Sequence, residues 1–471
     1  MAEGKQHLSI VICGHVDAGK STTTGRLIFD LGGIPEREMV KLKEEADRLG
    51  KGSFAFAFYM DRQKEERERG VTIACTTKEF FTATKHYTVI DAPGHRNFIK
   101  NMITGASQAD VALLMVPADG NFTTAIARGN HKAGEVQGQT RQHALLINLL
   151  GVKQLFVGIN KMDADLAGYK EARYKEIKDE MSSMLIRVGW LKKFVEESVP
   201  FLPISGWKGD NLIAKSTNMP WWNGVELKIN GKAVEFNGQT KFTTLLECLE
   251  HFVQVPERSS SAVARTPISG IYNIKGIGSV LTGRVEQGTV KPGEEVIFLP
   301  THTSSTPCDG KIFTVEMHHK SVPQAVSGDN CGFNIKGLKK ENMPRVGDVM
   351  VLKSDTSINR AGTFTTQVRV LDHPGELKPG YCPIAFVRTG RSAVRMTKID
   401  WKVGKETGNQ KLESPTSLKA NEMAQVVFEP QQPFVVDTFK NCEGLGRVAI
   451  MEGASVIMLG KVTATTAFVA K

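Results

Sequence analysis

GHVDAGKS, residues Gly14–Ser21, matches the pattern GxxxxGK[ST] and decides how the first part of the chain is expected to fold. The apolar run from Leu8 to Cys13 precedes it, and a helical stretch ending at Gly32 follows it. In a strand, loop and helix of this kind, backbone N–H groups surround phosphates, the lysine reaches the β/γ oxygens, and the serine hydroxyl binds Mg²⁺. The predicted phosphate site consists of Gly14, His15, Val16, Asp17, Ala18, Gly19, Lys20, Ser21 and Thr22.

Base selection is expected at a second motif, Asn160-Lys161-Met162-Asp163, which follows the apolar run from Leu155 to Ile159. The Asp163 carboxylate can accept hydrogen bonds from N1–H and from the 2-amino group of guanine. Adenine has neither donor and would leave the carboxylate unpaired, so such a site can discriminate by about 10⁴. We therefore expect GTP and GDP as ligands. Asn160 would bind the base edge or tie loops together. The predicted guanine site is Asn160, Lys161, Met162, Asp163, Ser205, Gly206 and Trp207.

Between these motifs, Asp91-Ala92-Pro93-Gly94-His95 ends another strand-like run. We expect Asp91 to hold Mg²⁺ through water and the Gly94 N–H to sense the γ-phosphate. Thr72 follows a highly charged segment, where its hydroxyl could complete the Mg²⁺ shell only when GTP is bound. His95 follows Gly94 and is the candidate catalytic residue, placed to act on the attacking water. The predicted metal ligands are Ser21, Thr72 and Asp91.

The pattern of apolar and polar residues changes at the polar segment after Pro256. Before it, β-branched runs alternate with charged helical stretches, which predicts an α/β fold with buried parallel strands. After it, strand-like runs are separated by glycine and proline turns, which predicts β-barrels. The expected architecture is an α/β P-loop GTPase domain at 1–256, followed by two all-β barrel domains at 262–354 and 360–471. The parallel strands are expected at Leu8 to Cys13, Tyr87 to Asp91, Val111 to Val116, Leu155 to Ile159 and Val199 to Ile204.

Composition limits the classes of protein that remain. The chain has 471 residues, more than one core usually supports, and a formal charge of +10, which fits a polyanionic partner or simple solubility equally well. Its seven cysteines are scattered without a CxxC pair, which argues against a disulfide framework and a zinc site. No signal-like start or long apolar stretch is present in the sequence. We therefore expect a cytoplasmic protein without membrane insertion.

With these residues in view, the chain resembles the elongation factor 1-alpha and elongation factor Tu family over essentially its whole length. The resemblance rests on ERERGVTI, DAPGHRNFIKNMITGASQAD, QTRQHALL, NKMD and SGWKGDN in the first part, and on GIGSVLTGRVEQGTVKPGEEV, VEMHHKSVPQAVSGDNCGFNIKG and LGRVAIMEGASVIMLGKV in the second. Ala18, Asn97 and the long segment at 129–137 depart from the usual eukaryotic pattern and are similar to the elongation-factor-like branch. These departures leave open which exchange factor is used and what the segment does.

The resemblance implies a GTP-dependent carrier of aminoacyl-tRNA that releases its cargo when GTP is hydrolysed on the ribosome. It implies aminoacyl-tRNA, the ribosome and a guanine-nucleotide exchange factor as partners, with actin as a further candidate. By motif position, Lys100 and Asn101 would lie near the tRNA 5′ end, and Glu316 and His318 near the terminal adenosine. The T-stem would lie along Arg388, Thr389 and Glu452. The alternative for each of these residues is an ordinary surface residue of a barrel or a residue of a turn.

Two alternatives remain. A termination or ribosome-rescue GTPase of the same superfamily shares the nucleotide motifs, and Ala18 favours it, whereas ERERG and SGWKGDN oppose it. A non-catalytic RNA-binding or actin-binding scaffold would have no use for an intact switch, and Lys20, Ser21, Thr72, Asp91, His95 and Asp163 are all present.

Overall fold

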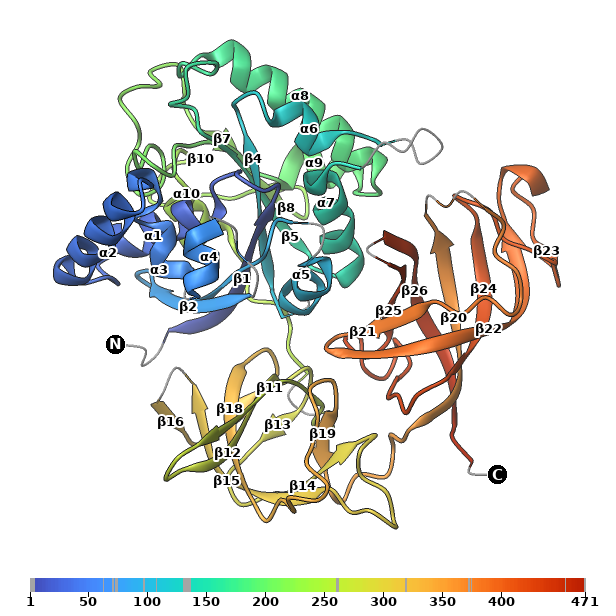
Figure 1. Ribbon diagram of the computed structural model, residues 1–471. Helices are drawn as coiled ribbons and strands as arrows, with labels where there is room; N and C mark the ends of the chain where they lie inside the picture. The colour runs from blue at the N-terminus through green and yellow to red at the C-terminus, as the bar shows by residue number, and fades with distance from the viewer. Residues whose placement is uncertain are drawn as a thin grey trace. The chain divides into compact units, whose positions relative to one another are not determined.

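The computed structural model divides the chain into two compact units, Met1–Pro256 and Glu257–Lys471 (Figure 1). It describes residues 5–61, 63–69, 72, 75–95, 98–106, 108–129, 137–259, 262–317, 320–371, 373, 375–453 and 455–469. Most of the long segment at 129–137, Asn97 and His318 lie outside these residues. The domain limits expected within the second unit stay predictions.

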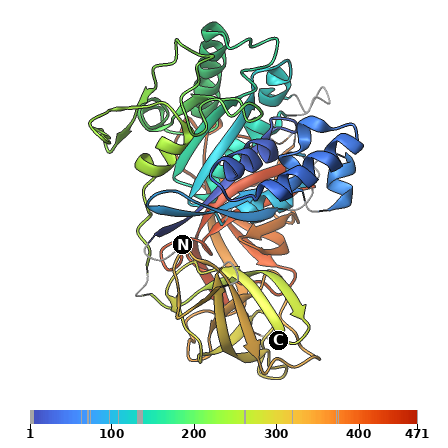
Figure 2. The same cartoon turned by 90° about the vertical axis from the view of Figure 1, so that its left-hand side faces the viewer.

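The N-terminal unit is built on one mixed sheet, with helices around it (Figures 1 and 2). The strand order is β2-β3-β1-β4-β5-β6, and β2 is antiparallel to β3 whereas the other neighbours are parallel. The strands are β1 (Gln6–Gly14), β2 (Thr76–Phe81), β3 (Lys85–Asp91), β4 (Val111–Pro117), β5 (Gln154–Asn160) and β6 (Phe201–Pro203). Every residue of β3 and β4 is buried, as expected for strands covered on both faces. The predicted parallel strands are confirmed.

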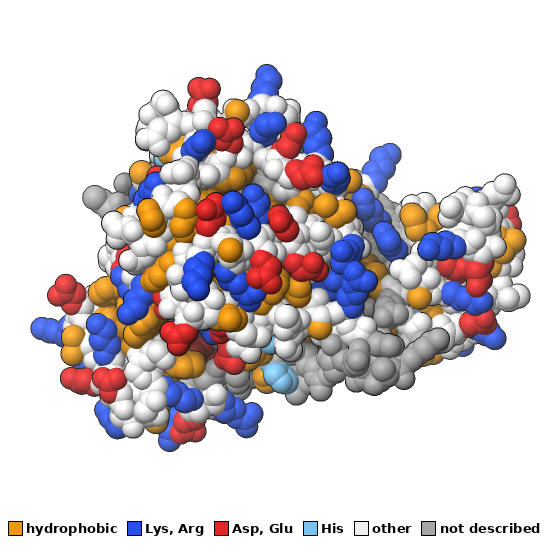
Figure 3. Space-filling view, turned by 90° about the horizontal axis from the view of Figure 1, so that it is seen from above, with side chains coloured by type: hydrophobic (Ala, Val, Ile, Leu, Met, Phe, Trp, Pro, Cys, Tyr) orange, Lys and Arg blue, Asp and Glu red, His pale blue; other side chains and the backbone are white. Residues whose placement is uncertain are grey.

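The helices connect these strands and bring polar loops to the carboxyl edge of the sheet. They are α1 (Lys20–Asp30), α2 (Glu36–Arg48), α3 (Ala57–Met60), α4 (Lys64–Arg69), α5 (Ile99–Ala106), α6 (Phe122–Ile126), α7 (Gln139–Leu150), α8 (Glu171–Arg187), α9 (Lys192–Ser198) and α10 (Leu245–Glu247). Seen from above the view of Figure 1, acidic and basic side chains lie interleaved with apolar ones over this unit (Figure 3). A helix able to span a bilayer is absent from the described part of the chain.

The C-terminal unit consists of two closed β-barrels in the residues that the structure describes. In the first, the order β14-β19-β11-β12-β18-β15 closes through β14–β15 pairing; in the second, β21-β25-β26-β20-β24-β22 closes through β21–β22 pairing. The first barrel uses β11 (Thr266–Ile274), β12 (Gly278–Arg284), β14 (Glu295–Leu299), β15 (Asp309–Met317), β18 (Asn330–Lys336) and β19 (Val349–Leu352). The second uses β20 (Ala361–Val370), β21 (Ile384–Val387), β22 (Gly390–Val403), β24 (Met423–Pro430), β25 (Arg447–Glu452) and β26 (Ser455–Ala467). The predicted fold class is confirmed.

Alternating burial along the strands fills each barrel with apolar side chains. Leu281, Phe298 and Phe333 belong to the core of the first barrel, and Phe364 and Phe428 to the core of the second. Closure pairs the edge strands of each sheet, which removes the exposed edges that an open sheet of this kind would present.

Candidate functional site

The phosphate-binding loop is shaped by glycines that no other residue could replace without strain. Gly14 ends β1 with φ of 141°, and a Cβ built on it would lie 2.3 Å from the backbone oxygen of Met115. Gly19 precedes α1 with φ of 82°, and a Cβ there would lie 2.3 Å from the Asn160 side chain. The loop is therefore confined between β4 and the Asn160 segment, and its N–H groups lie at the start of α1, where anions bind favourably.

Lys20 is a nearly buried cation at the first position of α1. Its side-chain nitrogen donates to the His15 carbonyl at 2.9 Å, and the residue is 6% exposed. A Cβ built on Gly94 would lie 2.5 Å from the Lys20 nitrogen, so the backbone of Gly94 passes directly beside it. Burial lowers the pKa of Lys20, and the Asp91 carboxylate opposes that shift. An anionic phosphate at this position would relieve the unfavourable burial of the charge.

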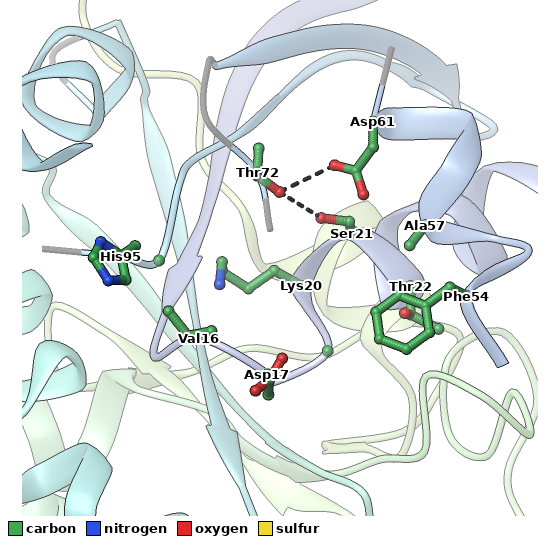
Figure 4. Close-up of a pocket in the computed structure, with 12 residues that line it drawn as sticks. Val16, Asp17, Lys20, Ser21, Thr22, Phe54, Ala57, Asp61, Thr72 and His95 are labelled. Carbon is green, nitrogen blue, oxygen red and sulfur yellow. Dashed lines mark hydrogen bonds between the residues drawn. The ribbon is translucent and has the colours of Figure 1, made fainter. Parts of the chain in front are cut away.

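Oxygen atoms that could hold Mg²⁺ gather beside Lys20 (Figure 4). The Ser21 and Thr72 hydroxyl oxygens are 3.1 Å apart, and the Thr72 hydroxyl donates to Asp61 at 3.1 Å. Both carboxylate oxygens of Asp91 are buried and have no hydrogen-bond partner of ordinary geometry among the described residues. Hard oxygen ligands of this kind suit Mg²⁺. Hydroxyl oxygens of two of the three predicted metal ligands, Ser21 and Thr72, thus lie side by side, and the metal itself stays a prediction.

The two carboxylates resist ionisation when no cation is bound. Burial raises the pKa of Asp61 to about 7, with a further contribution from the negative charge of Asp91. Burial also raises the pKa of Asp91 to about 6, opposed by the Ser21 hydroxyl and by Lys20. Sequence reasoning missed Asp61, because a single acid after the helical stretch at 57–60 carries no spacing signal.

His95 lies on the same cavity as the phosphate loop. The cavity is lined by Val16, Asp17, Gly19, Lys20, Ser21, Thr22, Phe54, Ala57, Asp61, Thr72, Gly94 and His95. Figure 4 shows the His95 ring on one side of the Lys20 chain and Asp61 on the other. The structure therefore brings together residues from four separate parts of the sequence, and it adds Phe54, Ala57 and Asp61 to those expected.

The segment expected to bind guanine is held against the phosphate loop through Asn160. Its side-chain nitrogen donates to the Ala18 carbonyl at 2.8 Å, and its oxygen accepts from the Gly206 N–H at 2.8 Å. The sequence leaves two roles open for Asn160, which are to bind the edge of the base or to connect loops. In the described contacts Asn160 connects two loops. Lys161 has φ of 63° and pairs with Asp119 at 2.8 Å, and the buried Met162 donates its N–H to the Ile204 carbonyl at 3.2 Å.

The neighbouring loop from Ser205 to Trp207 packs on α1. A Cβ built on Gly206 would lie 2.0 Å from the Thr23 hydroxyl oxygen, and the Trp207 carbonyl accepts from Arg26 at 2.9 Å. Asp163 is partly exposed at the end of the Asn160 segment. Both predicted guanine-binding segments thus lie next to the phosphate loop.

Helix α7 supports the phosphate loop from behind, which sequence reasoning had not assigned. The Gly14 N–H donates to Nδ1 of His143 at 3.0 Å, and the His15 N–H donates to the Thr140 hydroxyl at 3.3 Å. Burial, followed by the charge of Lys20, lowers the pKa of His143 to about 3, so its ring stays neutral and can accept. The sequence offers little signal for this role, because Thr140 and His143 lie in a polar first turn in which nothing distinguishes them from Gln139, Arg141 and Gln142.

The residues expected to contact tRNA are spread over several elements. Lys100 and Asn101 lie in α5, and Asn101 is exposed; the Lys100 side chain is outside the described residues. Glu316 lies on β15, and Glu452 ends β25, where its carboxylate accepts from the Tyr381 hydroxyl at 3.1 Å. Thr389 lies in the turn between β21 and β22. They belong to both units of the chain, and their role in binding tRNA stays a prediction.

Arg388 is already engaged by a carboxylate. Its guanidinium pairs with Glu286 at 2.7 Å, and the two side chains are 15% and 7% exposed. Glu286 belongs to the first barrel and Arg388 to the second, so the pair joins the two barrels. A contact between Arg388 and RNA would use another N–H of the guanidinium or compete with this pair.

Models of known protein families match three parts of the chain. The model of the elongation factor Tu GTP binding domain matches residues 5–255, that of elongation factor Tu domain 2 matches 278–351, and that of the GTP-eEF1A C-terminal domain-like family matches 363–463. Elongation factor 1-alpha of Blastocystis hominis is 42% identical over 466 residues, which is 99% of each chain. The chain belongs to the elongation factor 1-alpha/Tu family. As a member of that family it is a GTP-binding translational GTPase, and the resemblance predicted from its motifs is confirmed.

Solved structures agree with the elongation factor 1-alpha/Tu fold. The S. cerevisiae Ski7 GTPase-like domain bound to GTP has a TM-score of 0.75 at 18% identity, covering 98% of each chain. Translation elongation factor SelB from Methanococcus maripaludis has a TM-score of 0.64 at 19% identity, covering 98% of this chain and 80% of that one. At these identities the likeness concerns the fold alone, which relatives with different tasks share.

Proposed function

We propose that the protein delivers aminoacyl-tRNA to the ribosomal A site in the cytoplasm, and that GTP binding and hydrolysis control the delivery. The observation that carries this proposal is the full-length relationship to an elongation factor 1-alpha, at 42% identity over 99% of both chains. It is supported by the cavity in which Lys20, Ser21, Thr72, Gly94 and His95 meet. A scaffold that neither binds nor hydrolyses GTP would not need this arrangement.

In this proposal Ser21 and Thr72 would bind Mg²⁺ directly, and Asp91 and Asp61 would hold it through water. The metal would neutralise charge on the β- and γ-phosphates, as in other P-loop GTPases. The Thr72 and Ser21 hydroxyl oxygens lie 3.1 Å apart, which supports a shared role at the metal. Loss of the γ-phosphate would release Thr72 and Gly94, and the change would reach the tRNA-binding surfaces.

His95 has the catalytic role in this proposal. Phosphoryl transfer requires positioning of the attacking water and stabilisation of charge more than covalent help from the protein. His95 lies on the cavity beside Gly94, so its imidazole can orient a water toward the γ-phosphate. Contact with the ribosome would place the ring for this task, which keeps the free factor slow.

The tRNA contacts expected at Lys100, Asn101, Glu316, His318, Thr389 and Glu452 remain part of the proposal. Phosphate contacts would position the ligand without reading its sequence. Arg388 would join them either through a guanidinium N–H that the Glu286 pair does not use or in competition with that pair. A guanine-nucleotide exchange factor would restore GTP, and actin is retained as a secondary partner.

Protection of an aminoacyl ester from hydrolysis distinguishes this proposal from its rivals. The purified chain should slow hydrolysis of the ester bond in aminoacyl-tRNA with GTP and fail to do so with GDP. A termination or rescue GTPase would instead bind a peptide-release factor and leave the ester unprotected. A scaffold would bind RNA or actin equally with either nucleotide.

A further inference from the structure

An ion pair joins α2 to α4 in the N-terminal unit. Glu45 lies in the last turn of α2, and Arg67 lies in α4. Both carboxylate oxygens of Glu45 accept from Nη1 of Arg67, at 2.9 and 2.7 Å. Neither residue is among the described residues that line the nucleotide cavity. Any part that the pair takes in nucleotide binding must therefore act through other residues.

The other N–H groups of Arg67 hold the end of α3. Nε donates to the Asp61 carbonyl at 2.8 Å, and Nη2 donates to the Phe58 carbonyl at 3.2 Å. The guanidinium carbon lies 5.7 Å from the centre of the Phe58 ring. A guanidinium presents its N–H groups in fixed directions, so the carboxylate that orients Nη1 also aims Nε at Asp61. One side chain thus connects α2, α3 and α4, which lie together in the structure (Figure 1).

Asp61 leads from this pair to the nucleotide cavity. It is 3% exposed, and its Oδ1 accepts from the Thr72 hydroxyl, which lies beside the Ser21 hydroxyl (Figure 4). The contacts therefore run without a break from Glu45 to Ser21. Arg67 holds the backbone carbonyl of Asp61 and leaves its carboxylate to face the cavity. The pair can thus fix the position of this residue without using the group that a metal site needs.

Lys51 holds the end of α4 from the same side. Its Nζ donates to the Arg67 carbonyl at 3.1 Å and to the Glu68 carbonyl at 2.6 Å. A cation is favoured there, because the last carbonyl groups of a helix carry partial negative charge. The segment at 45–51 therefore contacts α4 through two separate charged groups, and both of them meet at Arg67.

We propose that Glu45 and Arg67 are positioning residues for GTP. Their pair keeps Asp61 and Thr72 in place beside Ser21, and its loss weakens the binding of GTP with Mg²⁺ but not the binding of GDP. This inference rests on the proposed function, in which Thr72 serves the metal only with GTP. GDP depends on the phosphate loop and on the guanine segments, which none of the described contacts of the pair reaches.

The first test measures the affinity of Glu45→Gln for a fluorescent, non-hydrolysable GTP analogue and for fluorescent GDP. The affinity for the analogue in Mg²⁺ should fall about fivefold, which is less than a buried charge-assisted hydrogen bond would give, because the pair is partly exposed. The Mg²⁺ concentration for half-maximal binding should rise by a similar factor. GDP affinity should change less than about twofold. Glu44→Gln, the same change at an exposed position of α2, should leave both affinities unchanged.

Arg67→Lys tests geometry apart from charge. Lysine keeps the positive charge but lacks the fork that reaches Glu45, Phe58 and Asp61 together. The variant should lose at least as much affinity for the GTP analogue as Glu45→Gln does. Addition of Glu45→Gln to it should cause less than about twofold further loss, because both changes break one series of contacts. Native affinity in Arg67→Lys would overturn the proposal.

Hydrogen exchange gives a readout that needs neither nucleotide nor Mg²⁺. In the chain without added nucleotide, the amides at 57–61 should exchange at least about threefold faster in Glu45→Gln than in the native chain, because the end of α3 loses its anchor. The amides of β4, which the pair does not contact, provide the internal control. Unchanged exchange at 57–61 would show that the pair does not hold this segment.

The two nucleotides separate positioning from general support of the fold. Equal losses of affinity for the GTP analogue and for GDP in Glu45→Gln would show that the pair only stabilises the domain, and would overturn the proposal. A native chain that binds neither nucleotide would instead contradict the proposed function.

Discussion

Lys20 in the N-terminal unit and Arg388 in the C-terminal unit are both nearly buried cations, yet their surroundings differ. Lys20 donates to a backbone carbonyl, and no described carboxylate lies within ion-pair distance of it. Arg388 faces Glu286 at 2.7 Å. A buried charge without a counter-ion costs free energy that only a ligand can offset, whereas a paired charge is satisfied by the fold. The two residues therefore differ in the presence of a counter-ion more than in burial. Lys20 has none and can bind an anionic ligand, whereas Arg388 has one and joins the two barrels.

Removal of Lys20 should give the largest effect on ligand binding. Lys20→Ala is expected to weaken GTP and GDP binding by about a thousandfold, as for loss of one partner of a buried charge pair. The free energy of unfolding without nucleotide should stay the same or rise, because the variant removes an unneutralised charge. Equilibrium binding of labelled GDP and chemical denaturation measure both, and Lys215→Ala at an exposed position provides the control. A marked loss of stability would contradict the contrast with Arg388.

Removal of Arg388 should act on stability instead. Arg388→Ala leaves the Glu286 carboxylate buried and unpaired, which is expected to cost about 3 kcal/mol of unfolding free energy. Glu286→Gln tests the pair from the other side and releases Arg388 for RNA. If the second variant binds tRNA more tightly than the native chain while Arg388→Ala binds it more weakly, then Arg388 also contacts RNA.

Replacement of His95 should separate chemistry from binding. His95→Ala is expected to slow ribosome-stimulated GTP hydrolysis at least about a hundredfold, the lower end of what a positioned acid–base group contributes. GTP and aminoacyl-tRNA affinities should be nearly unchanged, in contrast to Lys20→Ala. Single-turnover hydrolysis with programmed ribosomes measures the effect, and a variant that hydrolyses GTP at the native rate would remove His95 from the mechanism.

Lowering the pH should reduce the free energy of unfolding, because the His143 ring is neutral in the folded chain. We expect this effect to be the smallest of those predicted. Its pKa is lowered to about 3 in the folded chain, first by burial and then by Lys20. The unfolded chain therefore binds more protons than the folded chain between about pH 6.5 and pH 3, so stability is lost as the pH falls through that window. The loss should reach at most about 1.4 kcal/mol per pH unit. His143→Gln should reduce this slope in denaturation series between pH 6.5 and pH 5, and an unchanged slope would show that the ring is not held neutral.

The fold and the local motifs could be predicted because their signals are short and regular. Gly14–Ser21 and Asn160–Asp163 each follow a buried strand, and the ends of neighbouring parallel strands meet at one edge of the sheet. Asp61 and His143 could not be predicted as parts of the site. A single acid after a short helix, and a histidine in the polar first turn of α7, acquire their roles only when distant elements pack together. The pairing of Arg388 with Glu286 could not be predicted either, because 102 positions separate the two residues in the sequence.

The affinity of the chain for aminoacyl-tRNA in the presence of GTP and of GDP tests the central claim most directly. We predict tight binding with a non-hydrolysable GTP analogue, almost none with GDP, and a steady loss of affinity as salt increases, because phosphate contacts release counter-ions. Uncharged tRNA should bind more weakly than aminoacyl-tRNA under the same conditions. Equal affinity with the two nucleotides, or binding that salt does not affect, would contradict the account.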